Sequence, residues 1–88
     1  MPTTALTPTL LERAAHELRT EAGRVADARD TLARELKGLR WEAPVAERFR
    51  QSVRRRIAEL DDAERDLRLA AKRLQTSARE LAASAGRP

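Results

Sequence analysis

The sequence contains no cysteine and only one histidine, which excludes a disulfide framework, a cysteine-based zinc site and a thiol nucleophile. No apolar run approaches the roughly 18 residues that cross a bilayer, and no basic segment precedes an apolar stretch near Met1. We therefore expect no transmembrane helix and no cleavable signal peptide. Most carboxylates have an arginine at helical spacing, so no general acid/base pair is indicated. The composition predicts a protein that is not an enzyme, with no catalytic residues, metal or cofactor.

What the sequence has instead is the composition of long helices. Its 88 residues include 17 Ala, 16 Arg and 12 Leu, and charged residues make up 36% of the chain. These residue types are strong helix formers, and a chain rich in them is typical of long helices or coiled coils. At this length the chain forms at most one small domain.

A first helix is predicted over about residues 9–38. Its start has two alternatives: Thr7 as N-cap before Pro8, or Thr9 in a capping box with Glu12. Gly23 lies inside the helix and is expected to mark a close approach between helices. An apolar row on one face of this helix repeats every seven residues, at Leu11, Leu18, Val25, Leu32 and Leu39.

The pattern stops at residues 38–44, where the one interior turn is predicted. Gly38 suits the end of a helix, and Pro44 suits the first turn of the next one. A second helix is therefore predicted over about 44–83. Its apolar row keeps the same heptad repeat, which is typical of a coiled-coil seam, at Ala46, Val53, Leu60, Leu67, Leu74 and Leu81. Acid–base pairs four residues apart are expected between Asp30 and Arg34, Asp61 and Arg65, and Glu64 and Arg68.

The two helices are expected to form an all-α antiparallel hairpin domain over 9–83, with flexible ends at 1–8 and 84–88. One pair of helices covers only part of each apolar row, so a second hairpin should complete a four-helix bundle. The partner is either the same chain, in a homodimer, or another helical hairpin, in a heterodimer. The residues expected at this interface come from both apolar rows: Leu11, Leu18, Val25, Leu32, Val53, Leu60, Leu67 and Leu74.

The predicted turn holds the only tryptophan of the chain, Trp41, followed by Ala43, Pro44 and Phe49. This run resembles the turn of the WXG-motif family, the small ESAT-like helical-hairpin proteins of type VII secretion. In that resemblance Trp41 matches the motif tryptophan, Ala43 stands where the family has glycine, and Phe49 matches a downstream aromatic. The resemblance implies a dimer that acts as a secretion substrate, an escort, or a partner for the helical domain of a larger secreted protein.

The C-terminal tail departs from the family pattern. Family members carry an export signal after the second helix, a tyrosine followed four residues later by an acid, and this chain has no tyrosine. The resemblance then implies that a partner supplies the export signal. It also implies a cytoplasmic protein, or one exported by a type VII system without a cleavable signal peptide.

Positive charge gathers on the second half of the chain. Residues 44–88 hold eleven basic and seven acidic side chains, which accounts for the whole formal charge of +4. An arginine cluster follows the turn: Arg48, Arg50, Arg54, Arg55 and Arg56. It is either a solvated face or a docking patch for an acidic partner. The alternative functions are a basic helical protein that binds nucleic acid or an anionic membrane surface, and a cytoplasmic antitoxin-like helical partner unrelated to export. Nucleic acid is disfavoured, because the chain lacks stacking aromatics.

Overall fold

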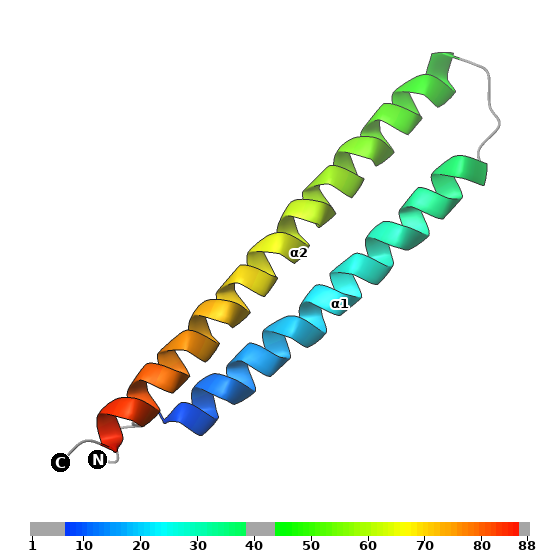
Figure 1. Ribbon diagram of the computed structural model, residues 1–88. Coiled ribbons are helices and arrows are strands. Elements are labelled where there is room, and N and C mark those ends of the chain that lie inside the picture. The colour runs from blue at the N-terminus through cyan, green and yellow to red at the C-terminus, as the bar shows by residue number, and fades with distance from the viewer. Residues whose placement is uncertain (1–6, 39–43, 87–88) are drawn as a thin grey trace, which may run out of the picture.

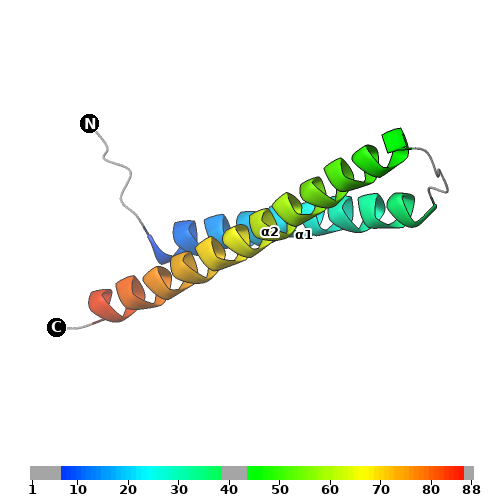
Figure 2. The ribbon, with the colours of Figure 1, turned by 90° about the horizontal axis from the view of Figure 1, so that it is seen from above.

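The protein is a pair of antiparallel helices. The computed structural model describes residues 7–38 and 44–86, in which α1 spans Pro8–Gly38 and α2 spans Pro44–Ala85 (Figure 1). The helices pack along each other and cross near their middles (Figure 2). Over these two ranges there is no strand. The predicted all-helical hairpin is confirmed at this level.

The ends of the helices follow from local capping. The Leu10 N–H donates to the Thr7 hydroxyl at 3.1 Å, so Thr7 is the N-cap and Pro8 the first helical residue. This decides between the two predicted starts. α1 ends at Gly38 and α2 begins at Pro44, both as predicted. α2 runs two residues beyond its predicted end, to Ala85.

Alanines form the centre of the contact between α1 and α2. Ala15 and Ala22 on α1, and Ala71 and Ala78 on α2, are each exposed by 1% or less. The Arg19 guanidinium donates to the Gln75 side chain across the pair, and each helix has one of these alanines on either side of that bond. Because alanine has no side chain beyond Cβ, the two backbones can approach closely here.

A heptad notation describes which rows face each other. We place the apolar rows that contain Leu11 on α1 and Val53 on α2 at position a. Four of the five buried alanines then lie four residues later, at position e, and the fifth, Ala46, lies at position a in the first turn of α2. The line of closest contact is therefore the e row of each helix. The Leu and Val residues of the a rows lie to one side of that line, on the rim of the contact.

The hairpin is a single thin layer. Its extents are 70 × 26 × 14 Å, and α2 overhangs α1 at both ends (Figure 1). Its radius of gyration is 19.9 Å, whereas a compact domain of this length has about 12 Å. Over the described residues, no side chain larger than alanine is buried. A stable domain normally needs two packed layers around a core, and here only one is present.

The prediction for Gly23 is wrong. A Cβ built on Gly23 would meet no neighbouring atom within 4 Å, so this glycine does not face α2. The close approach is made by the preceding residue, Ala22, which is fully buried. A glycine within a heptad pattern can lie on the outer side of the helix, where it only lowers helix propensity.

Replacing this glycine should stabilise the protein. Gly23→Ala adds a methyl group into open space and removes backbone freedom from the unfolded chain, so the free energy of unfolding should rise by about 0.5–1 kcal/mol. Thermal melts followed by circular dichroism, at one fixed chain concentration, measure this. The matched variant Ala22→Leu forces a large side chain between the helices and should lower the melting temperature. If Gly23→Ala were destabilising, Gly23 would face a neighbour after all.

Candidate interaction face

One face of the hairpin is apolar. Each helix turns its a row to the same side of its e row, and the helices are antiparallel, so the two a rows lie on one side of the layer. We call these residues the apolar face: Leu11, Leu18, Val25, Leu32, Val53, Leu60, Leu67, Leu74 and Leu81. A hollow of about 150 Å³ near the turn end joins the two helices on this side, lined by Leu32, Glu35, Leu36, Phe49 and Val53.

The side chains of the apolar face are only partly buried by the packing of α1 against α2. All eight residues predicted for the partner interface belong to it, and each is half-buried. Phe49, at the edge of the hollow, is 48% exposed. A row of Leu and Val side chains that stays partly exposed on each helix, on one side of the layer, is a candidate surface for docking another apolar surface.

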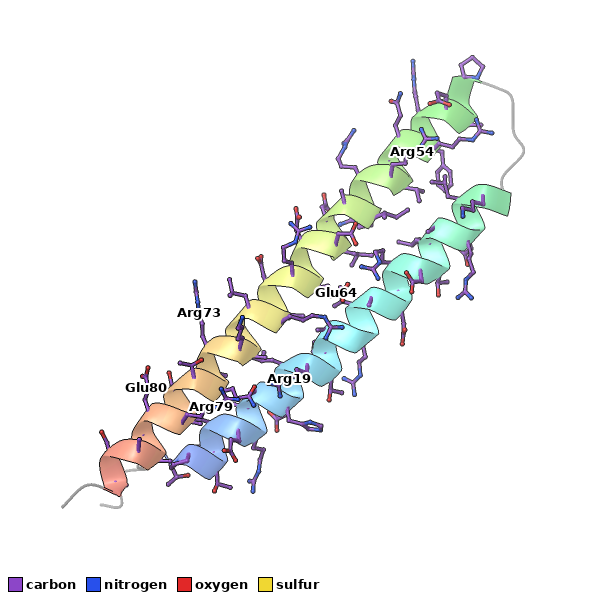
Figure 3. All side chains as sticks on the ribbon, viewed as in Figure 1. Arg19, Arg54, Glu64, Arg73, Arg79 and Glu80 are labelled. Atoms are coloured by element: carbon purple, nitrogen blue, oxygen red, sulfur yellow. The ribbon has the colours of Figure 1, made fainter. Side chains whose placement is uncertain are left out.

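The opposite face is polar and is held together by ion pairs. The Arg29 guanidinium reaches across from α1 to the Asp61 carboxylate at 2.7 Å and to the Glu64 carboxylate at 2.5 Å. Glu64 also accepts a hydrogen bond from Arg68 of its own helix at 2.8 Å. Glu64 and Arg19, which bonds Gln75, are labelled in Figure 3. These contacts link the helices on the polar side and show which residues of α1 lie opposite which residues of α2.

The ion pairs shift two pKa values. The pKa of Arg29 is raised, chiefly by its hydrogen bond to Asp61 and also by Asp30 and Glu64. The pKa of Glu64 is lowered, first by its hydrogen bond to Arg68 and also by the charge and hydrogen bond of Arg29, although partial burial works against the shift. Both groups are therefore held in their charged forms.

Sequence reasoning missed this cluster. Of the three predicted i,i+4 pairs, only Glu64 with Arg68 is formed. Asp61 instead pairs with Arg29 across the hairpin, and Arg65 pairs with Asp62 at 3.5 Å. A signal for the cluster was present, because Arg29 and Glu64 interrupt e rows in which every other position except Arg50, near the start of α2, is apolar.

A second corrected pair lies on α1. Asp30 contacts Arg29 at 3.2 Å rather than Arg34, and the Arg34 guanidinium donates to the Thr31 hydroxyl at 3.4 Å. Arg34 is exposed on the outer side of the helix, where water competes with the predicted pair.

The arginine cluster after the turn is partly neutralised by glutamates of its own helix. Arg50 and Arg54 both contact Glu47, at 3.5 and 3.7 Å, and Arg56 contacts Glu59 at 2.9 Å. Arg48 and Arg55 are exposed. Most of the cluster therefore lies along a solvated helix surface already balanced by acids.

Only some of the remaining residues predicted for functional sites lie in the part of the chain that the structure describes. Trp41 and Ala43 lie outside the described residues, whereas Pro44 begins α2 and Phe49 lies on its first turns. Within 7–38 and 44–86, no group of three or more His, Asp or Glu side chains is placed to hold a metal ion. Neither α1 nor α2 contains a stretch apolar enough to span a bilayer.

Comparisons with known proteins add no relative to these findings. No family model, no curated protein and no solved structure matches the chain.

The polar cluster predicts a specific pH dependence. Because the pKa of Glu64 is lowered in the folded state, the cluster stabilises the fold above the unfolded-state pKa of about 4.3, and this contribution is lost as pH falls through the folded-state value. The melting temperature of Glu64→Gln should therefore lie below that of the wild type at pH 7, and the gap should close towards pH 3. Glu80→Gln, in which the replaced side chain points away from α1 (Figure 3), is the control and should melt like the wild type at pH 7. A gap that stays constant with pH would contradict the role of Glu64.

Proposed function

We propose that this chain is a non-catalytic interaction protein that acts by covering its apolar face with a second helical hairpin, which completes a four-helix bundle. The observation that supports this most directly is the a row of each helix: nine Leu and Val side chains, all half-buried, on one side of a layer only 14 Å thick. Packing such a row against a second layer is the usual solution for helical domains.

The total exposed area is larger than that of a compact monomer, which supports the proposal. The chain exposes 7166 Å², whereas a compact monomer of 9.9 kDa exposes about 5,200 Å². The difference, about 2,000 Å² per chain, is spread over all sides of the elongated hairpin. A second hairpin laid on the apolar face would remove the share of this excess that lies on that face.

The finer proposal concerns the biological setting. A hairpin of this length, with its second helix starting at Pro44 and an aromatic at Phe49 beside the turn end, supports the resemblance to the WXG-motif family. On that basis we propose that the chain is a partner or escort in type VII secretion, and that it remains in the cytoplasm or is exported on a signal supplied by its partner.

One substitution in the apolar face, with a matched control substitution on the outer surface of α2, tests whether this face is the interface. Leu60→Arg places a charge in the middle of the apolar face, and we expect it to weaken association by about 3 kcal/mol or more and to leave a poorly helical chain. Leu69→Arg makes the same change at an outward position that is 46% exposed, and should change stability by less than about 0.5 kcal/mol. Sedimentation equilibrium and far-UV circular dichroism report both.

Salt separates this function from the alternative of a phosphate-binding protein. Association through an apolar face should persist in high salt, whereas binding to nucleic acid through the arginine cluster would weaken steeply. A Leu60→Arg chain that still associates and remains fully helical would contradict the proposal that the apolar face is the interface.

A further inference from the structure

We infer that the hairpin that covers the apolar face is a second copy of this chain, stacked with its turn end beside the turn end of the first, so that α1 of each copy packs along α2 of the other. This rests on the proposed pairing through the apolar face and names the partner and its orientation.

The d row of each helix lies on the side where a second layer would pack. In a square bundle of four helices, each a row points to the centre and the flanking d and e rows face the two adjacent helices. The e rows already meet within the hairpin, at the buried alanines. The d rows, three residues after each a position, are therefore the rows turned towards a second layer.

The d rows have the same character as the e rows. They are dominated by small side chains that are at least partly exposed: Ala14 and Ala28 on α1, and Ala63, Ala70 and Ser77 on α2. Within the hairpin, α1 packs against an antiparallel α2 through small side chains. A second copy whose α2 runs antiparallel along α1 would repeat this close contact with its d row.

Charge selects the orientation. The acids in the d rows, Glu21 and Glu35, are both on α1, and the base, Arg56, is on α2. Stacking the copies end for end would place α1 along α1, which gathers four glutamates at one contact and leaves the arginines at the other. Stacking them turn end to turn end places the acids of each copy along the base of the other.

The register brings Glu35 and Arg56 to the same height. Arg29 lies opposite Asp61 and Glu64. Six residues further along α1 is Glu35, and six residues back along α2 are residues 55–58. Across the two layers Glu35 of one copy would therefore face Arg56 of the other, twice in the dimer.

The existing contacts of these side chains leave them able to pair. Glu35 forms no ion pair with any residue that the structure describes, and Glu21 contacts Arg24 of its own helix at 3.2 Å. Arg56 contacts Glu59, but that pair is largely exposed. A solvent-exposed pair of this kind contributes little, so the guanidinium can turn to a new partner at low cost.

A charge exchange tests the contact. Glu35→Arg and Arg56→Glu should each raise the dimer dissociation constant about tenfold or more, because each puts two like-charge pairs into the interface. The double variant should recover most of the loss. Asp27→Arg and Arg55→Glu make the same charge changes on the outer surfaces of α1 and α2, and they should leave the dissociation constant within about threefold of the wild type.

Crosslinking tests the orientation independently, because the chain has no natural cysteine. Ala28 and Ala63 lie in d rows at the same height, next to the contact of Arg29 with Asp61 and Glu64. A mixture of Ala28→Cys chains with Ala63→Cys chains should form a disulfide-linked heterodimer on mild oxidation. Each variant alone should crosslink poorly, since equal positions would lie diagonally across the bundle.

The outcomes separate this inference from the proposed function. Recovery in the double variant together with the 28–63 crosslink supports the inference. A dimer in which Ala28→Cys crosslinks to itself overturns the orientation and leaves the proposed pairing standing. A weakly helical monomer overturns the second copy as partner and leaves a different hairpin as partner. A stably helical monomer overturns both.

Discussion

The structure depends on the small size of the side chains that lie directly between its two helices. Ala15, Ala22, Ala71 and Ala78 let the backbones approach closely but bury little apolar surface themselves. The leucines and valines of the a rows lie at the rim of this contact and remain partly exposed. Since burial of large apolar side chains is the main favourable term in folding, a second layer that covers the surface still exposed on these side chains would stabilise the chain further.

The two faces of the layer have different roles. On the polar face, Arg29 joins Asp61 and Glu64 in ion pairs that remain partly hydrated, so their stabilising effect is modest. They also show the register, since they join the heptads of α1 and α2 that lie opposite each other. That register places Glu35 level with Arg56 and thereby favours one orientation of a second copy. In the proposed dimer, the apolar face supplies affinity, and the charged residues beside it supply orientation.

The sequence was sufficient to predict both helices to within two residues, because caps and prolines act locally: Thr7, Gly38 and Pro44 mark their ends. It was not sufficient to distinguish the rows within the apolar stripe. A helical repeat shows that a stripe exists, but only the packed pair shows that e rather than d lies between the helices. For the same reason Gly23 was misplaced, and Asp61 was assigned to Arg65 when its partner is Arg29 on the other helix. Contacts between helices depend on register, which the separate helical patterns do not contain.

The most direct test of the central claim, that this hairpin is half of a bundle, is to follow the mass and the helicity of the purified wild-type chain together on dilution. Sedimentation equilibrium gives the mass, and far-UV circular dichroism on the same samples gives the helical content. The account predicts that the chain is highly helical only while associated, at about twice 9.9 kDa for the homodimer, and that helicity falls as the complex dissociates. A monomer that keeps its full helicity at every concentration would contradict it, because a single layer of two helices would then be stable alone.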